Sequence, residues 1–81
     1  MSGFLTTEDL RAITAESEAK APIGSQWRHR NGCLYEILGI GIAEGDQRPV
    51  VIYRPVGIDV PPWLRSADEF FDGRFSKEKT S

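Results

Sequence analysis

The most reactive side chains in this sequence belong to its one histidine and its one cysteine, His29 and Cys33, which lie four positions apart. An imidazole beside a thiol is the pairing that activates a cysteine nucleophile. The two residues flank Asn31-Gly32, a dipeptide typical of a tight hairpin turn in which both central residues take positive φ. A hairpin tip offers no evident oxyanion donors. The favoured interpretation is therefore a half-covered strand histidine and a small filler side chain, and an enzyme centred on this pair is kept as a third hypothesis.

Metal binding is not indicated either. One histidine, one cysteine and scattered carboxylates match no known ligand spacing. Asp68, Glu69 and Asp72 are close in sequence, but they fit a capped, solvated helical turn. We predict no metal, no cofactor and no enzymatic activity.

Aromatic residues and arginines recur together on the segments expected to form neighbouring strands. Such side chains can line a groove in which rings stack on a base, a nucleotide or a peptide while guanidinium groups meet phosphate or carboxylate. In a small domain, however, aromatic rings also build the core and the aliphatic stems of arginines cover it, which is the favoured alternative. The candidate ligand-binding or partner-binding residues are Trp27, Arg28, Arg30, Tyr35, Tyr53, Arg54, Trp63 and Arg65.

Length, charge and cysteine content exclude several classes of protein. The 81 residues have room for one domain, and a single cysteine excludes an internal disulfide and suits a reducing cytoplasm. Residues 24–65 carry five arginines and four carboxylates, a net charge of +1 that is far from the basic footprint of a duplex-binding protein. No apolar run is long enough to span a membrane, and no signal peptide is recognisable at the N-terminus. We expect a cytoplasmic protein that does not interact with membranes.

The N-terminal segment predicts one helix. Thr6 and Asp9 are spaced as a capping box for a helix over residues 7–20. Its apolar face is thin, because Leu10 and Ile13 are its only large members. We expect this helix to dock weakly, or to pack against a second copy in a homo-oligomer.

The rest of the chain predicts short β-strands and one further helical turn. Both faces of residues 34–42 are partly apolar, which favours a strongly bent strand that passes from one sheet to another, with Gly39 and Gly41 relieving the bend. Ser66 and Glu69 fit the cap of a single helical turn that Gly73 ends. The strands are expected near residues 27–30, 34–42, 49–54, 63–65 and 74–76.

Five short strands with a one-turn helix before the last are the arrangement of a small SH3-like barrel. The predicted fold is therefore mainly β, a five-stranded SH3-like barrel with an N-terminal α-helix. We divide the chain into the N-terminal helix (residues 1–22), the barrel (23–76) and a flexible tail (77–81).

Several motifs in this order carry a resemblance to a known family: Trp27-Arg28-His29-Arg30, Gly32, Leu34-Tyr35-Glu36-Ile37-Leu38-Gly39, Val51-Ile52-Tyr53-Arg54, Trp63-Leu64-Arg65 and Glu69-Phe70. Over roughly residues 23–75 the chain resembles the bacterial and phage family catalogued as domain of unknown function 1653. The resemblance implies an SH3-like β-barrel and a frequent phage or prophage origin. It implies no established activity.

Our leading functional hypothesis is a non-enzymatic protein-interaction module, a phage or prophage accessory protein that binds or inhibits a host or defence protein. The alternative is single-stranded nucleic-acid or nucleotide binding through an aromatic and arginine face. Self-association through the N-terminal helix is compatible with all three hypotheses, including the enzyme centred on His29 and Cys33.

Overall fold

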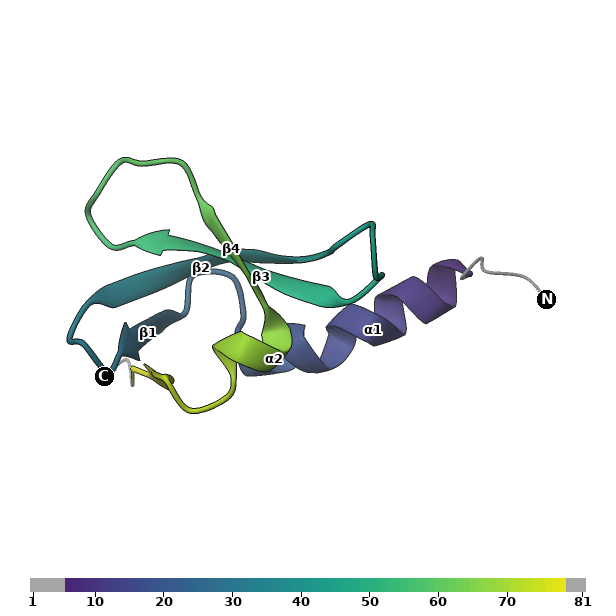
Figure 1. The fold of residues 1–81 in the computed structure, drawn as a ribbon, viewed down its shortest axis with the longest axis horizontal. Helices are drawn as coiled ribbons and strands as arrows, with labels where there is room; N and C mark the ends of the chain where they lie inside the picture. The colour runs from purple at the N-terminus through teal and green to yellow at the C-terminus, as the bar shows by residue number, and fades with distance from the viewer. Residues whose placement is uncertain (1–5, 79–81) are drawn as a thin grey trace.

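The computed structural model describes residues 6–78, which form one five-stranded antiparallel sheet and two helices (Figure 1). The elements follow each other as α1 (Thr7–Lys20), β1 (Gln26–His29), β2 (Leu34–Ile42), β3 (Pro49–Pro55), β4 (Trp63–Ser66), α2 (Ala67–Phe70) and β5 (Phe75–Lys77). The strand order in the sheet is β4-β3-β2-β1-β5, so the last strand returns to pair with the first. The prediction of a mainly β protein with five strands and two helices is confirmed.

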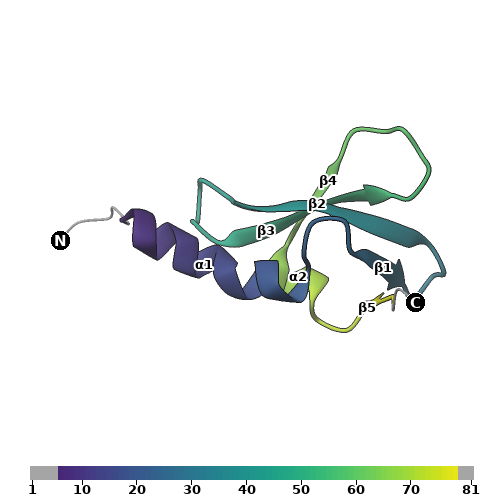
Figure 2. The ribbon, with the colours of Figure 1, turned by 180° about the vertical axis from the view of Figure 1, so that it is seen from behind.

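The sheet described by residues 6–78 is not a closed barrel. β4 and β5 are its two edges, and they are not hydrogen-bonded to each other. The chain passes from one edge to the other through α2 and the turn after it, without a strand pairing that would close the sheet (Figure 2). Closure of the expected barrel is therefore not observed.

β2 contains one extra residue at Leu38. Between Ile37 and Gly39 the partner strand β3 advances by a single position, which defines a β-bulge. Because of the bulge, Ile40 packs against the same core as Ile37 although an odd number of positions separates them. This explains why both faces of the segment look apolar in the sequence, and β2 stays within one sheet instead of passing between two.

The core lies on the face of the sheet that the helices cover, and it is mainly aromatic. Phe70 stacks on Phe75 with ring centroids 4.1 Å apart and planes 12° from parallel. Trp27 and Tyr53 meet Phe70 edge-on at 5.4 and 5.2 Å. Such aromatic pairs stabilise a fold by about 0.5–1.5 kcal/mol beyond their buried area. The buried core residues are Ala21, Trp27, Tyr35, Ile37, Val51, Tyr53, Ala67, Phe70 and Phe75.

α1 begins and ends where the sequence predicts. The Thr6 hydroxyl accepts from the Asp9 N–H and the Asp9 carboxylate accepts from the Thr6 N–H, both at 3.1 Å, which completes the capping box. Ser17 and Ala21, at the C-terminal end, are buried. Both helices lie on one side of β2 and β3, and the N-terminal part of α1 runs past the end of the sheet (Figures 1 and 2).

The β1–β2 hairpin forms at the predicted place with a different turn. The His29 carbonyl accepts from the Gly32 N–H at 2.8 Å, and the Cys33 N–H donates to the Asn31 side chain at 3.0 Å. Gly32 has φ +98°, whereas Asn31 is not among the residues with positive φ. The prediction of a two-residue turn with positive φ at both positions is therefore wrong: four residues connect the strands, and only the glycine is left-handed.

The end of β5 is more ordered than predicted. Lys77 pairs with Trp27, and the Glu78 N–H donates to the Gln26 carbonyl at 2.8 Å. The Glu78 carboxylate also pairs with Arg28 at 2.9 Å. β5 thus extends one residue, Lys77, into the segment assigned to the tail, and Glu78 is held to β1 by its contacts with Gln26 and Arg28.

Candidate functional site

An apolar groove opens between the start of β2, the end of β3 and the loop formed by residues 56–62. Its volume is about 520 Å³, and its lining includes no charged side chain. Val56, Ile58 and Trp63 are 36%, 55% and 46% exposed, which makes them three of the five exposed large hydrophobic residues in the described chain. The complete lining is Cys33, Leu34, Tyr35, Pro55, Val56, Ile58, Val60 and Trp63.

Local backbone contacts hold the loop over this groove. The Val56 N–H donates to the Leu34 carbonyl at 3.0 Å, which ties the start of the loop to β2. Gly57 has φ +80°, a conformation that glycine adopts without steric cost and that turns the chain here. Pro61 and Pro62 then fix φ on the way into β4. The loop therefore has few conformations to lose when the groove is filled.

Trp63 forms the aromatic wall of the groove. It is the first residue of β4 and pairs with Tyr53 on β3. Its ring packs on Tyr35 and Tyr53, with centroids 5.5 and 5.9 Å apart, while nearly half of the residue stays exposed. One side of the indole thus belongs to the core, and the remainder is available to a ligand.

Tyr35 lies beneath this wall. Burial, together with the neighbouring Cys33 thiol, raises the pKa of the Tyr35 phenol above its ordinary value. The phenol is therefore neutral at physiological pH, and the base of the groove carries no charge.

The aromatic candidates divide between core and groove. Trp27, Tyr35 and Tyr53 are buried, as the core interpretation expects. Of the eight candidates, Tyr35 and Trp63 also line the groove.

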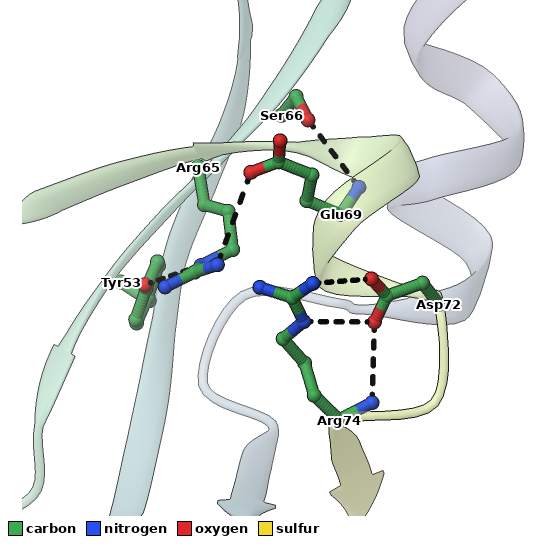
Figure 3. Close-up of polar contacts among 6 residues, drawn as sticks. All are labelled: Tyr53, Arg65, Ser66, Glu69, Asp72 and Arg74. Atoms are coloured by element: carbon green, nitrogen blue, oxygen red, sulfur yellow. Dashed lines mark hydrogen bonds and ion pairs between the residues drawn. The ribbon is translucent and has the colours of Figure 1, made fainter.

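The arginine candidates do not gather at the groove. Arg65 is held on the core side, where its Nε donates to the Tyr53 hydroxyl at 3.1 Å (Figure 3). Its Nη1 lies 3.8 Å from Glu69, and its guanidinium lies 5.7 Å from the centre of the Phe75 ring. The hydrogen bond to Tyr53 is the main cause that raises the pKa of Arg65. Arg65 therefore braces β4 against the core.

The other three arginines lie in different places. Arg28 is paired with Glu78 and also donates to the Gly32 carbonyl at 2.9 Å. Arg30 is exposed in the hairpin turn. Arg54 borders a separate polar cleft of about 240 Å³ with Glu36, Gly57, Ile58 and Asp59. The four arginines therefore do not form one continuous surface.

The sequence pattern of the family described as "Protein of unknown function (DUF1653)" matches residues 25–80. The chain belongs to this family. The match runs from β1 to β5 and leaves α1 outside, so the whole groove lies within the DUF1653 region. Comparison with curated proteins gives no significant match, and comparison with solved structures gives none either.

The His29 N–H donates to the Cys33 carbonyl at 2.8 Å, but the two side chains of this DUF1653 chain make different local contacts. The His29 Nδ1 accepts from the Asn31 N–H at 3.1 Å, and the imidazole packs edge-on against Phe75 at 4.9 Å. Cys33 is exposed and lines the groove. Among residues 6–78, no three His, Cys, Asp or Glu side chains gather as metal ligands. None of the helices in this part of the chain is both long and apolar enough to cross a bilayer.

Sequence reasoning missed the loop side of the groove. Val56, Ile58 and Val60 are apolar at alternate positions, yet the prolines and the glycine around them favour a loop. These alternating apolar residues lie in a segment that the prolines and glycine keep out of the sheet. That combination is the signal in the sequence that could have indicated an exposed apolar surface here.

Proposed function

We propose that this DUF1653 protein is a non-enzymatic protein-interaction module whose groove receives an extended apolar segment of a partner protein. The observation that carries the proposal is the uncharged groove with three exposed large hydrophobic residues on its walls. Small soluble domains seldom leave such side chains together in contact with water unless a partner covers them.

The chemistry of the lining favours a polypeptide over a nucleic acid. Binding of single strands combines base stacking with cationic contacts to the phosphates. Trp63 and Tyr35 supply aromatic surface, but the groove itself has no cation, and Arg65 is engaged with Tyr53 and Glu69. Aliphatic or aromatic side chains on an extended segment match this surface, because they bury area without leaving phosphates unpaired.

The wider assignment follows the family. The strand order β4-β3-β2-β1-β5, with a helical turn before the last strand, supports placing the fold among open relatives of the SH3-like barrels. A phage or prophage source and a cytoplasmic host or defence protein as partner are part of the same proposal, supported by the sequence resemblance and the lone cysteine.

The test is selection of binding peptides from a displayed random-peptide library against the immobilised full chain. We expect enriched peptides with clustered aliphatic or aromatic residues, whose addition changes the fluorescence of Trp63. The variant Ile58→Lys places a charge in the groove and should abolish binding. The matched control Leu64→Lys changes another exposed apolar residue outside the groove and should bind normally.

Two outcomes would refute the proposal. One is that no peptide is enriched, and the other is that peptide binding is equal in Ile58→Lys and in the unmodified protein. Binding of a labelled single-stranded oligonucleotide that weakens with salt and is unaffected by Ile58→Lys would instead support the nucleic-acid alternative.

A further inference from the structure

The loop wall of the groove, formed by Val56, Ile58 and Val60, has already used its backbone donors. The Val56 N–H donates to the Leu34 carbonyl at 3.0 Å. The Ile58 N–H donates to the Pro55 carbonyl at 3.4 Å, and the Val60 N–H donates to the Ile58 carbonyl at 3.1 Å. A partner that binds as an added strand needs a row of free N–H and C=O groups along an edge. The loop wall does not offer such a row.

The strand side of the groove does not offer one either. The Cys33 N–H donates to a side chain of the hairpin turn at 3.0 Å, and Tyr35 is paired with β1 on one side and β3 on the other. Pro55 has no N–H. The remaining lining residues, Leu34 and Trp63, lie on different strands. A strand added to the free edge of β4 would meet the groove at Trp63 alone, so β-pairing does not suit this site.

Trp63 carries a side-chain donor that the described residues leave unused. The Nε1 of the other tryptophan, Trp27, donates to the Ser25 hydroxyl at 3.2 Å, whereas the Nε1 of Trp63 has no acceptor among residues 6–78. The Trp63 and Tyr35 rings meet at 48°, with centroids 5.5 Å apart. The groove thus combines an angular aromatic corner, one free N–H donor and an uncharged lining.

We propose that the segment received by the groove is rich in proline and binds as a left-handed polyproline helix, an inference that rests on the function proposed above. Proline has no N–H, so its burial leaves no ligand donor without a partner. A polyproline helix makes no internal hydrogen bonds, and one of its carbonyls can accept from the Trp63 indole. Its uncharged rings complement the uncharged lining, and they stack on the aromatic corner.

The size of the groove suits one turn of such a helix. A polyproline helix has three residues per turn and rises about 3.1 Å per residue, so one turn is about 9 Å long. The groove volume of about 520 Å³ is typical of sites for small ligands. The helix is formed before binding, and the loop is stiffened by Pro61 and Pro62, so association costs little conformational entropy on either side.

The test is fluorescence anisotropy of three labelled peptides of equal length, titrated with the full chain. A polyproline peptide should bind, and an alternating proline–alanine peptide should bind about tenfold more weakly, because it is less ordered and buries N–H groups. An alternating threonine–valine peptide, which favours strands, should not bind. Trp63→Phe keeps an aromatic ring without the N–H and should weaken polyproline binding about three- to tenfold.

Two lysine variants locate the site. Ile58→Lys should abolish polyproline binding, Leu64→Lys should leave it unchanged, and circular dichroism should show that all variants are folded. Polyproline binding that persists in Ile58→Lys overturns the inference, and so does binding of the threonine–valine peptide in preference to polyproline. If polyproline does not bind at all, the inference is wrong. The proposed function then still stands if peptides selected from the random library bind and lose binding in Ile58→Lys.

Discussion

The guanidinium of Arg65 joins β4 to the aromatic core, and the variant Tyr53→Phe removes one defined part of that junction. The Arg65 Nε donates to the Tyr53 hydroxyl at 3.1 Å, and Tyr53 is 2% exposed. Phenylalanine keeps the ring, including its edge-on contact with Phe70 at 5.2 Å. The substitution therefore changes the hydrogen bond and little else.

The structure sets the size of the effect. A hydrogen bond to a charged group contributes about 1.5–3 kcal/mol to stability. The Arg65 side chain is 29% exposed and retains Glu69 at 3.8 Å. Water and this carboxylate compensate for part of the loss, so we expect Tyr53→Phe to lower the free energy of unfolding by about 1–2 kcal/mol. In a domain of this size, that corresponds to a decrease in Tm of about 5–15 °C.

Denaturant unfolding followed by tryptophan fluorescence measures this quantity in a double-mutant cycle with Arg65→Met, which keeps the aliphatic stem. If the hydrogen bond carries the effect, the double variant is about as stable as the less stable single variant, because the bond is already lost. Arg54→Met, on the opposite face of the sheet, is the matched control and should change stability little. The reasoning is refuted if Tyr53→Phe is as stable as the unmodified protein. It is also refuted if the double variant loses as much stability as the sum of the two single variants, because the changes would then be independent.

Four further predictions concern the core, the hairpin and two titrations. Phe70→Ala removes a fully buried ring and should lower the free energy of unfolding by about 3–5 kcal/mol, enough for circular dichroism to show extensive unfolding. Gly32→Ala forces an alanine to φ +98° and should cost about 1 kcal/mol or more in denaturant unfolding. Because the pKa of Tyr35 is raised in the folded state, the neutral phenol stabilises the fold fully below pH about 10, and this stabilisation is lost as pH rises through the native pKa. Denaturant unfolding at a series of pH values, with phenolate absorbance to follow ionisation, measures this loss. Desolvation acts to raise the pKa of Asp72, but hydrogen bonds from the Arg74 N–H and guanidinium lower it overall. The ionised Asp72 carboxylate therefore stabilises the fold above pH about 4, and this stabilisation is lost as pH falls through its native pKa. NMR titration should show a higher Asp72 pKa in Arg74→Gln.

Features encoded by neighbouring residues could be predicted from the sequence. The cap formed by Thr6 and Asp9 and the bond from the Glu69 N–H to Ser66 both depend on side chains three positions apart, and both are present. The helix over residues 7–20 followed from the first of these caps. Such contacts form within one turn of the chain and need no knowledge of the sheet.

Features that depend on register could not be predicted in the same way. Arg54 and Arg65 look equivalent in the sequence. Arg54, however, lies opposite Glu36 on the sheet face away from the helices, whereas Arg65 lies opposite the buried Val51 on the core face. Which face each occupies is fixed by strand pairing, and an extra residue such as Leu38 changes the alternation without any distinctive composition. A surface that combined the candidate aromatic residues and arginines would need them to point to the same face of the sheet. The observed strand pairing places Arg54 and Arg65 on opposite faces, so no such surface forms.

The two walls of the groove differ in how freely they can change. Tyr35 and Trp63 are packed against the aromatic core, so substitutions there disturb folding as well as binding. Ile58, by contrast, is a loop residue that is 55% exposed, and a change there removes little buried area. Loops supported by a rigid scaffold tolerate such changes well. Partner selectivity is therefore expected to depend on residues 56–60, and replacing them should alter the selected peptides while the free energy of unfolding stays nearly constant.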